Sequence, residues 1–590
     1  MNDMTAMPDW DLRDLYTGPD DPAIERDFRW CEAEATRLRE AWNGKVGTAG
    51  GDALAGGIAD YEAMTDRTGR LMAFAFLTWA TDMSDGVRTR FYQGVQERMN
   101  RLTAQTLFFT IELTRLENER LDTLYASSAK LAKYRPWLRD LRTMRDHVLS
   151  DELERLFHER SITARNAWTR LFDETIAKLR FTVDGQDMPL QNAINLTSDR
   201  DPAKRKRAAT EVSRVLAQHI DTFALILNTL VRDKQIEDDW RGIQQPEHGR
   251  HMLNQVEPEV VDALRKAVFD RLPRLSHRYY ALKARWLGME KLGHQDRNAP
   301  LPDADDRVIG WPDAVDIVLT AYGRFSKDLA GVGRRFFDNA WIDAGPKPGK
   351  SPGAFAHPVV PSTHPYLLMN YQGKVRDVMT LAHELGHGVH QVLSAGQGAL
   401  MCDTPLTLAE TASVFGEMLT FRSLLDSAGN PHRRRAMLAS KVEDMINTVV
   451  RQTAFYEFEL RLHRKRREGE LSADDIGRIW LDVQTETLGP VFELDEGYRV
   501  WWCYINHFVH VPFYVYAYAF GDCLVNALYA EYQRAPDGFA EKYLEMLSAG
   551  GTLRHKDLLA PFGLDASDPQ FWARGLSVIE GFIDELEAMS

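Results

Sequence analysis

Cysteine is scarce in this chain. Only four of the 590 residues are cysteines (Cys31, Cys402, Cys503 and Cys523), and no two of them have the C-x-x-C spacing. We therefore expect neither a disulfide framework nor a structural zinc site built from thiolates. This cysteine usage is typical of a reduced protein, and we expect a cytoplasmic location.

Positive charge is also in deficit. The chain has 72 lysines and arginines against 86 aspartates and glutamates, which gives a net charge of -14. Broad nucleic-acid binding normally needs a basic surface, because the phosphate backbone supplies most of the affinity. We therefore expect no nucleic-acid partner.

Long apolar runs are missing as well. The run "LMAFAFLTWA" at residues 71–80 has about half the length that a bilayer crossing needs, and "VPFYVYAYAFGDCLV" is interrupted by Pro512 and Asp522. The opening residues "MNDMTAMPDW" have neither the basic region nor the apolar region of a secretory signal. We expect no membrane partner.

Helical periodicity dominates what is present. Apolar residues recur at three- and four-residue intervals in residues 20–42, 258–288 and 433–470. Ser472, followed by Asp475, is typical of a helix start, and Gly288 and Gly469 are typical of helix ends. The sequence predicts a mainly α, bilobed protein.

The length of the chain predicts more than one lobe. A turn at Asp184-Gly185, followed by a polar stretch that contains proline, favours a division near residue 190. We therefore expect an N-terminal helical lobe at residues 1–190 and a catalytic domain at residues 191–590.

One region interrupts the helical pattern. Residues 344–365, "AGPKPGKSPGAFAHPVVPSTHP", are too rich in glycine and proline to form a helix. The next residues, "YLLMNYQG" (366–373), favour a short β-strand, and a new helix is expected near Asp377. The edge of this strand could hold an extended peptide as an added strand, or the strand could simply close the core.

The helix that follows contains "AHELGH", a His-Glu-x-x-His pattern. His383 and His387 are four residues apart, so they lie on one helical face and can bind one zinc ion. Glu384 is rotated by about 100°, beside the metal, where it can act as general base on a zinc-bound water. The alternative is a surface helix with two solvated histidines. Its apolar neighbours, and Gly386 and Gly388 within the helix, argue against that alternative.

A third metal ligand is expected further along the chain. Glu410 and Glu417 are seven residues apart, two helical turns, in the nearly uncharged segment "TLAETASVFGEML". Carboxylates in apolar surroundings need a cation or hydrogen-bond donors. We predict Glu410 as the ligand of one Zn²⁺ per chain. Glu417 either orients a ligand or pairs with an arginine or lysine elsewhere.

Histidine and tyrosine are concentrated in residues 504–521. His507, His510, Tyr514, Tyr516 and Tyr518 lie in a short apolar run. Tyrosine hydroxyls and a histidine can stabilise the oxyanion that amide hydrolysis develops, although such aromatic runs are more often part of a core. Tyr514 and Tyr518 share a helical face, and Tyr516 is expected to point away from them.

Several segments together resemble the M3 family of zinc metallopeptidases, in its oligoendopeptidase F branch. They are "WDLRDLY" (10–16), "LLMNYQGKVRDVMTLAHELGHGVH" (367–390), "LAETASVFGEML" (408–419), "RQTAFYEFELRLH" (451–463) and "INHFVHVPFYVYAYAFG" (505–521). The resemblance touches both ends of the chain and is densest from about residue 353 to residue 523.

The resemblance implies a bilobed helical enzyme with a deep channel that cleaves internal bonds of short peptides. It implies that His383, His387 and Glu410 bind zinc, that Glu384 is the general base, and that His507 contacts substrate. Tyr514 and Tyr518 match the family's tyrosines best, and Tyr516 stays open. His510 departs from the branch, where an aromatic or aliphatic residue is expected.

Two other functions remain possible from the sequence. A zinc exopeptidase, either a dipeptidyl carboxypeptidase or an aminopeptidase, would need a group that reads a chain terminus, and no such motif is evident. A non-catalytic helical peptide-binding protein would have no need for the complete set of catalytic groups. The oligomeric state is not determined by the sequence.

Overall fold

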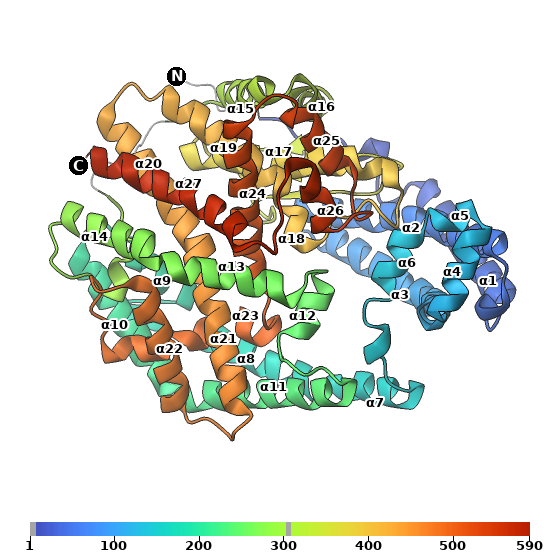
Figure 1. The fold of residues 1–590 in the computed structure, drawn as a ribbon, viewed down its shortest axis with the longest axis horizontal. Helices are drawn as coiled ribbons and strands as arrows, with labels where there is room; N and C mark the ends of the chain where they lie inside the picture. The colour runs from blue at the N-terminus through green and yellow to red at the C-terminus, as the bar shows by residue number, and fades with distance from the viewer. Residues whose placement is uncertain (1–6, 302–307, 590) are drawn as a thin grey trace. The chain divides into compact units, whose positions relative to one another are not determined.

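The computed structural model describes residues 7–301 and 308–589, and α-helices make up most of it (Figure 1). The predicted mainly α fold is confirmed. Among the helices of these residues, none combines the length and the apolar character that a membrane crossing requires.

The chain forms two compact units, each assembled from three separate segments. Unit 1 comprises residues Met1–Arg145, Asp306–Ser427 and Glu531–Leu564, and unit 2 comprises Asp146–Asp305, Ala428–Ala530 and Asp565–Ser590. These bounds differ from the division near residue 190, which stays a prediction about domains along the sequence. Residue 190 lies within unit 2, because the chain passes between the units several times and local composition does not mark each passage.

Unit 1 contains a helical bundle from the N-terminal segment and a layer of helices from the later segments. Its α-helices are α1 (Pro22–Trp42), α2 (Gly51–Ala80), α3 (Gly86–Arg115), α4 (Asn118–Ser127), α5 (Ala129–Ala132), α6 (Arg135–Leu141), α15 (Trp311–Phe325), α16 (Lys327–Asp338), α17 (Val375–Ser394), α18 (Leu406–Ala409), α19 (Thr411–Asp426), α25 (Phe539–Ser548) and α26 (His555–Leu559). Helices α1, α2 and α3 pack on one another, and α17 packs on α15, α16 and α19.

Unit 2 is built from long helices with one small hairpin. Its α-helices are α7 (Asp151–Ser161), α8 (Arg165–Lys178), α9 (Leu190–Asn195), α10 (Pro202–Gln218), α11 (Ile220–Arg241), α12 (His248–Leu253), α13 (Pro258–Arg271), α14 (Ser276–Trp286), α20 (Pro431–Ile446), α21 (Gln452–Arg466), α22 (Ala473–Leu488), α23 (His507–His510) and α27 (Pro569–Ala588), with most of α24 (Tyr516–Arg534). A π-helical turn at Asn447–Arg451 joins α20 to α21.

Local sequence signals coincide with the ends of these elements. Ser472 and Asp475 form the predicted capping box at the start of α22. Gly288 has φ +67° just after α14, the left-handed conformation that glycine tolerates best. The turn at Asp184-Gly185 joins β1 (Phe181–Val183) to β2 (Gln186–Met188) with positive φ at both residues, as in a two-residue hairpin turn.

A three-stranded sheet lies against α17. Its order is β3 (Ile342–Asp343), β5 (Tyr366–Leu368) and β4 (Phe355–His357), with β3 parallel and β4 antiparallel to β5. The predicted strand at residue 366 is confirmed. The prediction that its edge could receive a peptide is wrong, because β5 is the central strand and both of its edges are paired. The edge strand beside it is β4.

Candidate metal centre

Helix α17 is anchored by a buried apolar face. Val378, Leu381, Ala382, Leu385 and Val389 are all fully buried, as the sequence predicts. The first turn is fixed by Asp377, whose Oδ2 accepts hydrogen bonds from the backbone N–H groups of Gln372 and Lys374. This packing holds the rotation of α17 and therefore the direction of its polar face.

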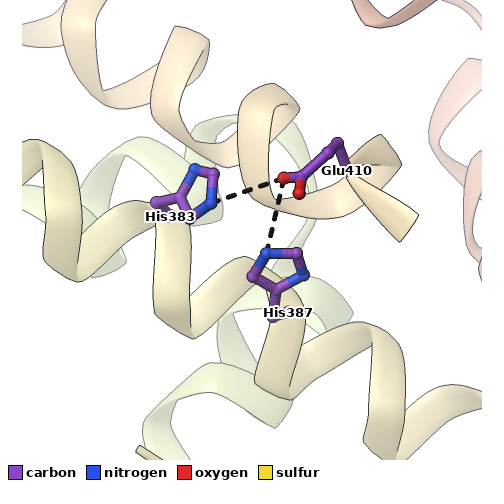
Figure 2. Close-up of side chains that lie close together, drawn as sticks. All are labelled: His383, His387 and Glu410. Atoms are coloured by element: carbon purple, nitrogen blue, oxygen red, sulfur yellow. Dashed lines mark ion pairs between the residues drawn. The ribbon is translucent and has the colours of Figure 1, made fainter. Parts of the chain in front are cut away.

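His383 and His387 occupy successive turns of that face. Figure 2 shows both imidazole rings directed towards the carboxylate of Glu410, which follows α18 at the junction with α19. Glu410 Oε2 lies 3.4 Å from His383 Nε2 and 3.4 Å from His387 Nε2. The three predicted ligands are therefore brought together, from segments more than twenty residues apart.

The spacing of these atoms suits a metal ion. The three residues each offer one ligand atom, and these atoms all lie within 4.8 Å of one another. Zinc binds imidazole nitrogen and carboxylate oxygen at about 2.0–2.2 Å, so two ligands at the tetrahedral angle are separated by about 3.3–3.5 Å. The separations from Glu410 agree with this value, and the cluster can hold a metal with a coordination position left for a further ligand.

Gly386 explains how α17 comes so close to the chain that carries Glu410. A Cβ atom at Gly386 would lie 2.5 Å from the carbonyl oxygen of Ala412 and 2.6 Å from Cα of Ser413. Both neighbours are backbone atoms, which cannot turn aside as a side chain can. The glycine in "HELGH" is therefore required for close packing.

Two side chains orient the ligands. Glu417 Oε2 lies 3.3 Å from His383 Nδ1, which directs the other ring nitrogen, Nε2, towards Glu410. This contact fits the role of orienting a ligand, one of the two roles weighed for Glu417. Ser413 Oγ donates a hydrogen bond of 2.6 Å to Glu410 Oε2. No sequence motif marks Ser413, and its position three residues after Glu410 is the one signal of this contact.

The protonation equilibria reflect a compact cluster of opposite charges. Burial by itself would raise the pKa of Glu410, but His387 and His383 outweigh it and lower the pKa to about 2. Burial by itself would lower the pKa of His383, but the hydrogen bond to Glu417 and the nearby carboxylates raise it instead. The cluster therefore stabilises positive charge among its carboxylates, which is what a bound cation requires.

Glu384 lies next to the ligands without being one of them. Its side chain is largely buried, and burial raises the pKa of its carboxyl group, although His383 and His387 oppose this. The nearby backbone N–H of Ala356 in β4 also acts on this carboxyl group and lowers its pKa. Edge strand β4 thus faces Glu384, a contact that no sequence pattern indicates because it uses only backbone.

The predicted substrate-side residues gather in unit 2. His507 Nε2 lies 3.3 Å from the hydroxyl of Tyr518, and the Tyr514 and Tyr518 rings are 5.4 Å apart. All three side chains are partly exposed. Tyr514 precedes α24, which begins at Tyr516, so the idea that both tyrosines share one helical face is wrong. A turn at residues 511–514 brings the two rings together instead.

Tyr516 and His510 have structural contacts of their own. Tyr516 is almost fully buried, and its hydroxyl bonds Asn254 Nδ2 at 2.8 Å and His251 Nδ1 at 3.1 Å, so it points away from Tyr514 as predicted. His510 Nε2 lies 2.9 Å from Asp173 Oδ1, on α8. The unusual histidine is therefore paired with a carboxylate of a neighbouring helix.

The turn that carries Tyr514 is held by a residue that the sequence analysis missed. Phe513 has φ +59°, a conformation that costs free energy for a bulky side chain, and its N–H donates a 2.8 Å hydrogen bond to Glu459 Oε1. Glu459 is buried in α21, and burial raises its pKa to about 8. The segment "FYEFELRLH" contains this carboxylate among apolar residues, which is a signal that the sequence offered.

A His-Glu-x-x-His helix with a carboxylate close enough to complete a metal site is the arrangement typical of metallopeptidases. A family model described as peptidase family M3 matches residues 327–578, and one described as Oligopeptidase F matches residues 112–181. The chain belongs to peptidase family M3, in its oligoendopeptidase F branch.

Two relatives and two solved structures illustrate this. The chain is 26% identical to Oligopeptidase PepF of Bacillus subtilis (100% of this chain, 88% of the relative) and 26% identical to Group B oligopeptidase PepB of Streptococcus agalactiae (98% and 96%). A putative peptidase from Chlamydophila abortus has a TM-score of 0.87 at 22% identity (98% of each chain). Oligoendopeptidase-F from Enterococcus faecium has a TM-score of 0.69 at 21% identity (96% and 99%). The two solved structures support the fold.

Proposed function

We propose that this chain is a zinc-dependent endopeptidase that hydrolyses internal bonds of short oligopeptides. The observation that carries the proposal is the position of His383 Nε2 and His387 Nε2, each 3.4 Å from Glu410 Oε2, with Glu384 beside them. The names of the relatives, oligopeptidase and oligoendopeptidase F, support peptides as the substrate class.

Zinc fits the donor set, because two imidazoles and one carboxylate are typical of a catalytic zinc site. His383, His387 and Glu410 would hold it. When bound, it would polarise the substrate carbonyl and make the attacking water acidic enough to react near neutral pH.

Glu384 is the proposed general base. It takes the proton from the attacking water and then delivers it to the leaving amine. Burial raises its pKa, which makes the carboxylate a better proton acceptor than an exposed one. The nearby backbone N–H of Ala356 offsets part of this rise.

The free edge of β4 is the proposed support for the substrate backbone. β4 pairs with β5 through one edge only, and Ala356 at its centre faces Glu384. An extended peptide added to this edge would run past the general base, with main-chain hydrogen bonds that do not depend on its side chains. His507, with Tyr514 or Tyr518, is proposed to donate hydrogen bonds to the developing oxyanion.

The test uses a peptide set of mixed length and the variant Glu384→Gln. Wild-type protein should make internal cuts in short peptides, lose activity with a chelator, and regain it with zinc, as read by mass spectrometry. Glu384→Gln should keep its metal and lose about 10²–10⁴-fold in kcat. Wild-type turnover by this variant would contradict the proposed base, and stepwise loss of terminal residues would identify an exopeptidase.

The cytoplasmic location also remains a proposal. It rests on the scarcity of cysteine, which fits a reducing compartment. Cell fractionation with an antibody against the chain would test it, since recovery outside the cytoplasmic fraction would contradict it.

A further inference from the structure

A small cavity in unit 2 is lined by two arginines that have no carboxylate partner. Gln484 lines it together with Arg297 and Arg451. Its volume of about 10 Å³ leaves room for one small ion or one water molecule.

Three nitrogen donors on these lining residues are unsatisfied. Arg297 Nε, Arg451 Nε and Gln484 Nε2 are buried and have no hydrogen-bond partner. The whole Gln484 side chain is buried. Buried donors of this kind are rare in folded proteins, because each costs the free energy of its lost hydration.

The orientation of the Gln484 amide follows from its neighbours. The hydroxyl group of Tyr498 is the donor in its hydrogen bond with this side chain. It donates to Gln484 Oε1, at 3.1 Å. The amide nitrogen is then the end left without a partner, and it adds a third donor at the cavity.

The charges around the cavity do not balance. Neither Arg297 nor Arg451 forms an ion pair within the described part of the chain. Arg451 Nη2 bonds the hydroxyl of Tyr504 at 3.2 Å, and its guanidinium lies over the ring of Phe455. Burial lowers the pKa of Arg451, and the neighbouring Arg297 lowers it further. Two guanidinium groups thus lie close together in a poorly solvated place.

Carboxylates of the same region are already paired. Asp296, next to Arg297 in sequence, forms a buried ion pair with Arg205 at 2.8 Å. Glu443 pairs with the buried Lys283. These pairs neutralise themselves and leave the charges of Arg297 and Arg451 uncompensated, which favours a bound counter-ion.

We propose that this cavity binds one small inorganic anion, of the size of chloride, between Arg297, Arg451 and Gln484. A water molecule is a poorer fit, because it accepts hydrogen bonds from two donors, whereas three unsatisfied nitrogen donors and two positive charges line the cavity. A carboxylate or phosphate is too large for the cavity. The site is independent of the proposed peptidase activity.

The first test is crystallography of the full-length protein grown in sodium bromide. Bromide is the probe, because it replaces chloride and scatters anomalously. An anomalous peak in the cavity, within hydrogen-bond distance of Arg297 Nε, Arg451 Nε and Gln484 Nε2, is expected. An empty cavity, or a water molecule without anomalous signal, would overturn the proposal.

The second test measures thermal unfolding in sodium chloride and in sodium gluconate at equal ionic strength. Chloride should raise the midpoint of the wild-type protein by about 1–2 °C relative to gluconate. The variant Arg451→Met should lose this difference. The control Arg478→Met, at an exposed position of α22, should keep it. If chloride raised the midpoint of Arg451→Met as much as that of wild type, the proposed anion site would be wrong. This outcome does not depend on whether the protein has peptidase activity.

Discussion

Replacing Gly386 by alanine tests whether close helix packing sets the metal centre. The added Cβ would lie 2.5 Å from the Ala412 carbonyl oxygen, whereas ordinary contacts begin at 3.4 Å. The backbones must therefore separate by roughly 1 Å. Glu410, two residues before Ala412, moves with its segment, and metal ligands tolerate only about 0.2 Å. We expect the zinc affinity of Gly386→Ala to fall at least about tenfold.

Gly386→Ala should also lower the stability of the fold. Within a helix, alanine is favoured over glycine by about 1 kcal/mol, so Gly386→Ala would stabilise the protein if nothing stood in its way. Overpacking costs about 1–3 kcal/mol, and we expect net destabilisation. The matched control is Gly331→Ala in α16, where a Cβ meets no atom within 4 Å and a small gain is expected. Zinc affinity is measured by competition with a chromophoric chelator, and stability by thermal unfolding. A stabilised Gly386→Ala with wild-type zinc affinity would refute the reasoning.

Three further variants test the remaining contacts. Glu417→Ala should lower zinc affinity by about 10–100-fold in the same chelator competition, because His383 loses its orienting partner, and unchanged affinity would assign Glu417 a different role. Tyr518→Phe should lower kcat by about 10²–10³-fold with little change in stability. The control Tyr516→Phe should mainly lower the thermal midpoint. If Tyr518→Phe lowered the midpoint and left kcat unchanged, Tyr518 would have no part in oxyanion stabilisation. Glu459 has a pKa of about 8, against 4.5 for an ordinary glutamate. Its contribution to the free energy of unfolding is therefore complete below pH 4.5 and is lost as the pH rises through 8. Over that range wild type should lose up to about 5 kcal/mol relative to Glu459→Gln, and parallel pH profiles of the two thermal midpoints would contradict the raised pKa.

The elements that the sequence predicts well depend on neighbours within a few residues. The apolar face of α17, the capping box at Ser472 and the hairpin turn at Asp184-Gly185 all follow from local periodicity and turn chemistry. The same holds for His383 and His387, since the helix itself sets their spacing.

Predictions that needed longer range were less complete. The sequence predicts a strand at residue 366. Its central position depends on pairing with β3 and β4, which come from other segments of the chain. The sequence predicts Tyr514 in a helix, but the helix starts only at Tyr516. The turn before it depends on the positive φ of Phe513, which a bulky residue does not signal in the sequence. The two units could not be predicted either, because each is assembled from three segments that are separated in the sequence.

The sequence by itself determined that this protein is mainly helical, that one buried helix presents two histidines and a glutamate, and that Glu410 is a suitable third ligand. Only the tertiary structure decided that Glu410 Oε2 lies 3.4 Å from Nε2 of each histidine, that Gly386 permits this approach, and that the backbone N–H of Ala356 lies near Glu384. The physical reason is that helical periodicity is a property of adjacent residues, whereas these distances arise from packing between segments far apart in the chain.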